Sequence, residues 1–502
     1  MTAPDSVTSA DALAGHPHLQ DLAGFVRASP SSYHAAAEVA RRLEAVGYRR
    51  VDEREEFPAG PGGYVLVRDG AVIAWRIPDG VAHPGAEGAA AAGGGSGDVA
   101  TGAGPGTGAG PGAGAADAVP VFRILGAHTD SPTFKLKPRP STSREGWLQA
   151  GVEVYGGPLL NSWLDRELCF AGRLVTEDGT EHLAATGPVA RFPQLAIHLD
   201  RDVNNGLKLD RQHHMNPVWG AVGGNAAPAD ILAVLARSAG LDPQAVRGFD
   251  VVMADTQAPG LFGASAEFFA SGRLDNLSSV HAGLVALEAL ESPDPPRPPA
   301  SDGSRSADTP EGRDGNAAAE PTGQARVIPV LAAFDHEELG SASRSGAAGP
   351  VLEDVLRRVL DALGVSGQGP ARSLAGSWLL SADAGHLVHP NYTERHDPVN
   401  HPRVNAGPLL KINANQRYST DAAGAAAFAR WCAHAGVPFQ EFVSNNAVPC
   451  GSTIGPISAT RLGVRTVDVG IGLLSMHSAR EMCGARDPGY LAAAVGSFFA
   501  GV

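Results

Sequence analysis

The chain alternates short apolar runs with segments whose apolar residues recur at every third or fourth position. Apolar runs that fit buried strands lie at 121–130, 249–255, 327–338, 377–383 and 466–477. The helical spacing of apolar residues predicts helices at 31–46, 277–290, 350–363 and 420–435. This alternation is typical of an α/β fold, in which helices sandwich a mixed sheet.

The pattern changes between residues 135 and 249. Glycine and proline are scattered there, and polar and apolar residues alternate as in LQAGVEVYGG. Such alternation indicates half-buried strands. We therefore predict a β-rich domain over 135–249, serving oligomerisation or acting as a lid, inserted into one discontinuous domain made of 1–134 and 250–502.

Two stretches differ from the rest of the chain. Residues 84–118 are almost all glycine and alanine, and residues 291–325 are rich in proline, serine, aspartate and glycine. Such composition buries too little apolar surface to offset the entropy lost on ordering, so we expect both to be disordered insertions. A dinucleotide-binding glycine loop is the alternative for 84–118, but that loop is a tight turn between a strand and a helix.

Composition excludes several classes of partner. The formal net charge of −14 over 502 residues gives no electrostatic basis for binding nucleic acid or anionic lipid. The N-terminus has no basic and apolar leader, and no uninterrupted apolar run of about 18 residues follows. The 4 cysteines include no Cys-x-x-Cys pair. We expect a cytoplasmic protein in a reducing compartment, with no membrane or nucleic-acid partner.

Polar residues at the ends of the apolar runs are the candidates for chemistry, because active sites of open α/β sheets lie outside the carboxyl ends of the strands. His128 and Asp130 project to one side of an extended segment, so the imidazole could bind a metal while the carboxylate orients it. Glu337 and Glu338 follow a strongly apolar run and would repel each other without a cation or a shared proton. A helix start is the alternative for this pair. Gly340 stands where a His-Glu-x-x-His motif needs its second histidine.

Asp275, Asp383 and His477 complete the set of candidate ligands. Each alone is more often a turn or cap residue. Two histidines and three carboxylates can nevertheless hold two zinc ions if one carboxylate bridges them. The charges would then balance, with one hydroxide added, which removes the repulsion between the carboxylates.

Ordered motifs through most of the chain together resemble the aspartyl aminopeptidase family of dinuclear zinc peptidases. They are GAHTDSP (126–132), GRLDNL (272–277), FDHEELGS (334–341), SADAGHLVHPNY (381–392), KINANQRYSTDA (411–422), PCGSTIGPISA (449–459) and MHSAREM (476–482). The resemblance implies that the discontinuous domain is a zinc-peptidase catalytic domain. It also implies peptide substrates and a homo-oligomer, such as a dodecamer.

The resemblance also assigns roles to the candidate ligands. Asp275 would bridge two Zn²⁺ per subunit, with His128 and Asp383 on one ion and Glu338 and His477 on the other. Glu337 would be the general base, moving a proton from water to the leaving amine. Mn²⁺ or Co²⁺ would also suit such carboxylate-rich sites. His336 stands where the family often has another polar residue, which leaves the role of Glu337 unchanged.

Further roles concern the substrate. His198 would reach the site of a neighbouring subunit and polarise the substrate carbonyl. Lys411 would pair with an acidic side chain on the first residue of the substrate, in a pocket lined by His386, Tyr418 and Met476. A lysine in the apolar run GPLLKIN fits burial against an anion, although it could also extend to solvent.

Other functions stay open at this point. The same metal centre could remove neutral residues or hydrolyse N-acylated amino acids, and the chain could be an inactive scaffold. The sequence contains no Gly-x-Ser-x-Gly elbow of a serine hydrolase. We therefore predict a metal-dependent aminopeptidase that prefers N-terminal Asp or Glu.

Overall fold

Apolar strands from distant parts of the chain form one central sheet. The computed structural model describes residues 13, 15–81, 119–222, 230–291 and 326–502. The expected insertion at 84–118 lies outside these residues. Of the expected insertion at 291–325, the structure describes Glu291 alone. Within the described residues the central sheet has nine strands. Their order is β1 (Arg49–Arg50), β2 (Gly62–Arg68), β3 (Ala71–Ile77), β13 (Val327–Phe334), β4 (Val121–His128), β14 (Trp378–Ala382), β18 (Arg465–Gly470), β16 (Leu409–Ile412) and β17 (Gln440–Val443).

The sheet is mixed. Strands β13, β4, β14 and β18 run parallel, whereas β3 is antiparallel to β13 and β16 is antiparallel to β18. The parallel register sets Phe334 of β13 opposite His128 of β4, so these two strands end at the same level. Polar residues that follow the strands therefore gather at one edge of the sheet.

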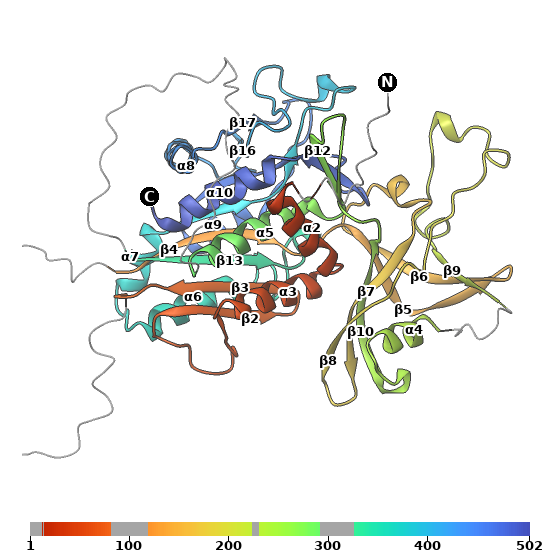
Figure 1. Ribbon diagram of the computed structural model, residues 1–502, viewed down its shortest axis with the longest axis horizontal. Coiled ribbons are helices and arrows are strands. Elements are labelled where there is room, and N and C mark those ends of the chain that lie inside the picture. The colour runs from red at the N-terminus through yellow and green to blue at the C-terminus, as the bar shows by residue number, and fades with distance from the viewer. Residues whose placement is uncertain (1–12, 14, 82–118, 223–229, 292–325) are drawn as a thin grey trace, which may run out of the picture.

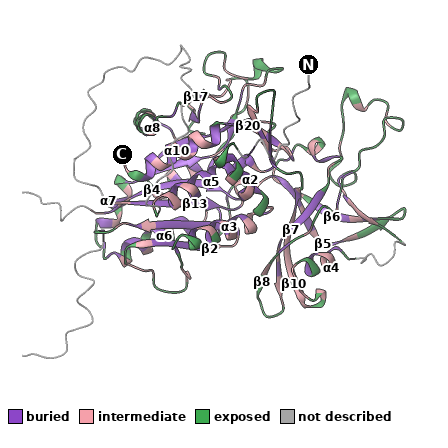
Figure 2. Ribbon diagram, in the orientation of Figure 1, coloured by how far each residue is buried: buried purple, intermediate pink, exposed green. Residues whose placement is uncertain are grey.

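Helices cover both faces of the central sheet, as Figure 1 shows. The first face packs against α2 (Pro17–Ala28), α3 (Ser32–Ala45), α5 (Leu274–Ala289), α8 (Ala422–Ala435) and α10 (Asp487–Ala500). The second face packs against α6 (Val351–Ala362), α7 (Gly369–Gly376) and α9 (Ile454–Leu462). The strands between these layers are buried over most of their length (Figure 2). The expected helix-covered mixed sheet is confirmed.

Local sequence signals explain where the helices begin and end. Ser31 caps α3 by accepting the backbone N–H of His34, and Asp421 caps α8 by accepting that of Gly424. Helix α8 ends at Gly436, whose φ of +67° is a left-handed conformation that glycine adopts without strain. The four helices expected from apolar spacing correspond to α3, α5, α6 and α8.

A second, antiparallel sheet stands beside the first (Figure 1). Among the described residues it has six strands, in the order β8 (Glu181–Ala185), β7 (Leu168–Thr176), β10 (Val246–Asp255), β5 (Thr133–Arg144), β6 (Trp147–Tyr155) and β9 (Val218–Ala221). Helix α4 (Ile231–Ser238) packs on it and shares its separate apolar core. We call this part of the molecule the β-rich region.

The expected borders of the β-rich region, at 135 and 249, fall inside β5 and β10. All of β10 lies in the second sheet, where it pairs with β7 through Asp255. The run FDVVMAD reads like the buried strands of the central sheet, and its apolar pattern does not distinguish between the two sheets.

A small third sheet lies near the carboxyl edge of the central sheet. Its described strands, in order, are β11 (Gly260–Phe262), β12 (Phe268–Ser271), β20 (Glu481–Gly484), β19 (Gly472–Leu474) and β15 (Gly385–His386). The described connections also contain short 3-10 helices: η2 (Leu160–Trp163), η3 (Val203–Asn205), η4 (Pro243–Ala245), η5 (Glu337–Leu339) and η6 (Thr393–Arg395). No helix in the described part of the chain is long and apolar enough to cross a membrane. The 4 cysteines are free, and Cys169, Cys432 and Cys483 are buried.

Candidate metal centre

The residues expected to bind metal come together at the carboxyl edge of the central sheet. His128 is the last residue of β4, and Asp383 directly follows β14. Glu338 lies in the turn η5 after β13, and His477 lies in the loop between β19 and β20. Asp275 is near the start of α5, where its extended backbone (φ −80°, ψ 103°) interrupts the helix.

Asp275 is at the centre of this cluster. Its Oδ1 lies 3.4 Å from Nε2 of His128, and its Oδ2 lies 3.4 Å from Nε2 of His477. Nε2 of His128 is also 3.4 Å from Oδ1 of Asp383, and Nε2 of His477 is 3.5 Å from Oε1 of Glu338. Each oxygen of Asp275 therefore faces a different imidazole, and each imidazole faces a further carboxylate.

These positions fit two metal ions that share one carboxylate. Ligand atoms of His128, Asp275 and Asp383 lie within 4.8 Å of one another, and so do those of Asp275, Glu338 and His477. Oδ1 of Asp275 is buried and accepts no hydrogen bond, although an unpaired buried oxygen is costly. A cation at this place would satisfy it. His128, Glu337 and Glu338 form a third close group, so Glu337 could also approach a metal.

Both histidines direct the same nitrogen into the cluster. Nδ1 of His128 lies 3.0 Å from the backbone oxygen of Asp130, and Nδ1 of His477 lies 3.1 Å from that of Gly157. A carbonyl oxygen can only accept, so each Nδ1 carries a proton, and Nε2 is the nitrogen that can bind a metal once its own proton is lost. That is the tautomer that a metal ligand needs.

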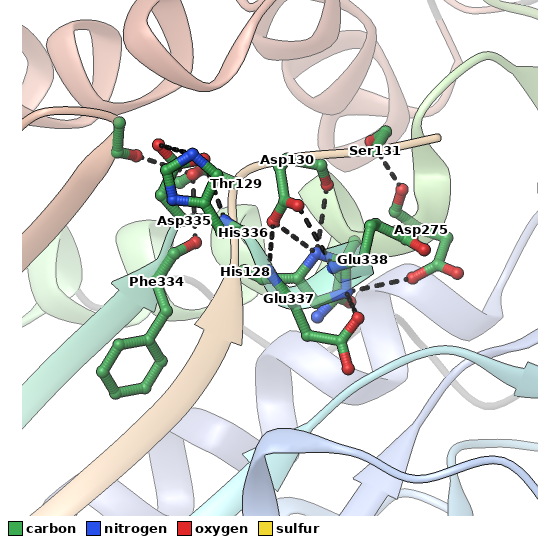
Figure 3. A network of polar contacts seen from close by, with 12 residues as sticks. His128, Thr129, Asp130, Ser131, Asp275, Phe334, Asp335, His336, Glu337 and Glu338 are labelled. Atoms are coloured by element: carbon green, nitrogen blue, oxygen red, sulfur yellow. Dashed lines mark hydrogen bonds and ion pairs between the residues drawn. The ribbon is translucent and has the colours of Figure 1, made fainter. Parts of the chain in front are cut away.

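Asp130 holds the turn that carries the two glutamates. Its Oδ1 accepts the backbone N–H of Glu337 at 3.0 Å, and its Oδ2 accepts that of Glu338 at 3.2 Å (Figure 3). The hydroxyl of Tyr155 also donates to Oδ2, at 2.9 Å. Oδ1 of Asp130 lies 3.5 Å from Nδ1 of His128, which is farther than the backbone oxygen of Asp130 at 3.0 Å. Asp130 thus orients His128 through its main chain and the Glu337 turn through its side chain.

Glu481 contacts the main chain of two candidate ligands, and the sequence did not single it out. Its Oε2 accepts the backbone N–H of Asp275 at 3.0 Å, and its Oε1 accepts that of His477 at 2.8 Å. The residue stands in the quoted motif MHSAREM, but a single acid within a short strand gives no pattern that would mark it. The available signal is a carboxylate at the start of an otherwise apolar strand, four residues after His477.

The metal-free cluster retains protons. Burial alone would lower the pKa of His128, but the carboxylates of Asp130, Asp275 and Asp383 raise it well above its usual value. Burial likewise opposes a raised pKa at His477, yet Asp275 and Glu338 raise it to about 10. Both imidazoles are therefore protonated at neutral pH until a cation replaces their protons.

The pKa values of Glu337 and Glu338 are both raised. Burial raises the pKa of Glu337 to about 7, with the charges of Asp383 and Asp130 adding to the effect and His128 opposing it. Burial and the charge of Asp275 raise the pKa of Glu338 well above its usual value. A carboxyl with a pKa near neutrality can both accept and return a proton.

A cavity of about 250 Å³ lies beside the cluster. His386, Tyr418 and Met476 are among the residues that line it, and their role in binding substrate stays a prediction. Lys411 is buried behind this wall. Its Nζ donates to the backbone oxygen of Ala384 at 2.8 Å and lies 5.4 Å from the centre of the Tyr418 ring.

His198 lies apart from the cluster. It occupies an exposed turn in the long loop between β8 and β9, in the β-rich region. The apolar side chains of Leu195, Ile197 and Leu199 are exposed around it. Within the described residues, no hydrogen bond or ion pair joins His198 to any of the candidate ligands.

Comparison with known proteins agrees with this geometry. The profile of the family described as aminopeptidase I zinc metalloprotease (M18) matches residues 114–296 and 316–499. The chain is 47% identical over 483 residues to a probable M18 family aminopeptidase 2 of Streptomyces coelicolor, covering 96% of this chain and 97% of that protein. It is 38% identical over 491 residues to the protein so described in Pseudomonas fluorescens, with 96% and 97% covered.

Solved structures share the fold. A chain in the cryo-EM structure of an Ape4 and Nbr1 complex superposes with a TM-score of 0.79 at 31% identity, covering 100% of this chain and 88% of that chain. The mApe1 dodecamer of S. cerevisiae gives a TM-score of 0.72 at 23% identity, with 96% of each chain covered. The family profile and the Streptomyces relative both span most of the protein. The chain therefore belongs to the M18 family of zinc metalloaminopeptidases.

Proposed function

We propose that this aminopeptidase uses two zinc ions per subunit and prefers peptides that begin with Asp or Glu. The observation that supports two ions is the position of Asp275, whose two oxygens face two different imidazoles at 3.4 Å each. His128 and Asp383 would complete one site, and Glu338 and His477 the other. Mn²⁺ or Co²⁺ could replace zinc in such a carboxylate-rich set.

Bound at these positions, the ions would polarise the scissile carbonyl and make a coordinated water more acidic. Glu337 is then the general base. Its Oε2 lies 4.0 Å from Nε2 of His128, beside the cluster, and its side chain is partly open to solvent. It would accept a proton from the attacking water and deliver it to the nitrogen of the leaving peptide. Asp130 keeps Glu337 in place through its backbone N–H.

The acidic preference rests on positive charge near the cavity beside the cluster. Lys411 is only 1% exposed, and its ammonium group stands behind Tyr418. The guanidinium of Arg395 lines the same cavity. A carboxylate on the first residue of the substrate would gain from this charge, because electrostatic attraction is strong where water is excluded. Met476 would contact the apolar part of that side chain.

We also propose a homo-oligomer in which His198 reaches the active site of a neighbouring subunit and polarises the substrate carbonyl. The exposed apolar residues around His198 support this, because a second copy of the chain would cover them. The relative mApe1 forms a dodecamer, and we propose that size here. Free cysteines fit our proposal of a cytoplasmic location.

A substrate panel tests the proposal. Purified protein is assayed on chromogenic Asp, Glu, Leu and N-acetyl-Asp anilides, after chelation and after titration with zinc. Activity on Asp and Glu should exceed that on Leu, should be lost for the acetylated compound and should saturate at two zinc ions per chain. Saturation at one ion would contradict the two-zinc site. Faster turnover of the Leu anilide would contradict the preference for acidic residues.

A further inference from the structure

Residues 155–162 of the β-rich region contact the metal centre at several points. Tyr155 is the last residue of β6, and its hydroxyl donates to Oδ2 of Asp130 at 2.9 Å. Asp130 in turn accepts the backbone N–H groups of Glu337 and Glu338. One phenol from the second sheet is thereby joined to the turn that carries the candidate base and a candidate ligand.

The same segment contacts the loop of His477 at several points. The backbone oxygen of Gly157 faces Nδ1 of His477 at 3.1 Å, and the backbone N–H of Leu159 donates to the oxygen of His477 at 2.9 Å. Two residues further along this loop, the backbone N–H of Ala479 donates to Oγ of Ser162 at 3.0 Å. The segment thus fixes both the main chain and the ring of this candidate ligand.

Gly156 connects these two sets of contacts. Its φ is +70°, and a Cβ at this position would stand 3.1 Å from Cβ of Glu338. The backbone of the segment therefore lies directly against a candidate ligand. A side chain here would press on Glu338 at less than the ordinary contact distance and would be strained by the positive φ.

We propose that residues 155–162 position the metal centre, with Tyr155 holding the Glu337 turn through Asp130 and Gly157 setting the ring of His477. The inference rests on the proposed two-zinc site. It assigns the β-rich region a part in metal retention and proton transfer in addition to assembly. Tyr155 is a positioning residue, because its hydroxyl acts on Asp130 and it does not line the cavity of His386, Tyr418 and Met476.

Tyr155→Phe removes the hydroxyl and keeps the ring. Tyr64→Phe is its matched control, since the Tyr64 hydroxyl also donates one hydrogen bond, to Gly60 O at 2.7 Å, in a strand remote from the cluster. Loss of a group that supports a metal ligand commonly lowers metal affinity or activity by about 10- to 100-fold. We expect zinc to transfer from Tyr155→Phe to a chromophoric chelator at least about tenfold faster than from the control.

Gly156→Ala tests the other end of the segment. Gly146→Ala is its control, because Gly146 has a φ of +82° in the turn before β6 and a Cβ there would meet nothing within 4 Å. Both substitutions place a side chain at a positive φ next to β6, but only Gly156→Ala sets a Cβ against Glu338. We expect faster zinc release from Gly156→Ala alone, with a changed visible absorption spectrum of the Co²⁺-substituted protein.

Activity gives a second readout. In Tyr155→Phe, kcat should fall about tenfold with KM within about twofold, and the pH profile of kcat should shift, because the base is displaced while the cavity is intact. Zinc release and Co²⁺ spectra identical to those of the controls would overturn the inference. An unmodified protein that binds fewer than two zinc ions or lacks peptidase activity would instead contradict the proposed function.

Discussion

The carboxylate of Glu481 accepts the backbone N–H of Asp275, with 3.0 Å between Oε2 and N. Its other oxygen accepts the backbone N–H of His477 at 2.8 Å. A residue that need not touch metal therefore ties together the chain segments of a candidate bridging ligand and a candidate terminal ligand.

Glu481→Gln should weaken zinc binding. The amide keeps one acceptor and places a donor against the second N–H, which leaves a buried group unsatisfied at a cost of about 1–3 kcal/mol. We expect zinc affinity to fall by about 10- to 100-fold in competition with a chelator. Glu267→Gln is the control, because Glu267 also accepts a backbone N–H, from Ser265, but lies away from the cluster. Equal affinities in the two variants would contradict this role.

Glu337→Gln should abolish proton transfer and retain the metal. The loss of a general base typically lowers kcat by about 10²- to 10⁴-fold. Zinc content, measured by atomic emission, should stay at the unmodified level, and Glu337→Asp should recover part of the activity. Loss of zinc from Glu337→Gln would show that this residue is a ligand, as its proximity to His128 and Glu338 allows.

Zinc binding should release protons and strengthen with pH. The pKa of His477 is raised to about 10, and that of His128 is raised well above its usual value, so both rings hold a proton at pH 7 in the metal-free protein. Zinc requires neutral imidazole, and acid therefore competes with it. Affinity should rise at least about tenfold per pH unit between pH 6 and 8, for each proton displaced. Calorimetry in buffers of different ionisation enthalpy counts those protons, and a count of zero would refute the prediction.

Lys411→Met separates two roles of the lysine. If its charge attracts an acidic substrate, kcat/KM for an Asp anilide should fall about 10- to 100-fold relative to a Leu anilide, because a charged interaction contributes about 1.5–3 kcal/mol. Its Nζ also lies 3.8 Å from Oδ2 of Asp383. Equal losses on both substrates would indicate that the lysine supports Asp383 and does not select the substrate.

His198→Ala and Glu337→Gln should complement each other. Each variant alone should be nearly inactive if the histidine acts in a neighbouring subunit. In randomly mixed oligomers about a quarter of the sites would combine an intact Glu337 with an intact His198. Co-expression with two affinity tags isolates these mixed assemblies, and activity no higher than the sum of the single variants would exclude action between subunits.

Several features of the site were predictable because they are unfavourable without a metal. Carboxylates follow the buried strands at Glu337, Glu338 and Asp383, and neighbouring carboxylates repel one another. A parallel sheet also brings the carboxyl ends of its strands together. The structure accordingly gathers all the candidate ligands at one edge. Their roles as ligands stay predictions until metal is measured.

Contacts to the main chain were not predictable. Glu481 and the side chain of Asp130 act on backbone N–H groups, and the ring of each histidine is set by a carbonyl oxygen. Every residue has such groups, so no pattern of side chains encodes them. Apolar periodicity also did not reveal that the strand ending at Asp255 belongs to the second sheet, because a short apolar run fits a buried strand of either sheet.

The register of the central sheet has a practical consequence for engineering this enzyme. Phe334 and His128 lie at one end of β13 and β4, and the pair Val327 and Val121 lies at the other end. Helix α5 likewise leads away from the cluster, by roughly 24 Å over its 16 residues. The described residues that flank 82–118 and 292–325 follow β3 and α5 and precede β4 and β13 on that distant side. A fluorescent or affinity module built into either connection should therefore leave turnover unaltered, giving two attachment points for following the enzyme in cells.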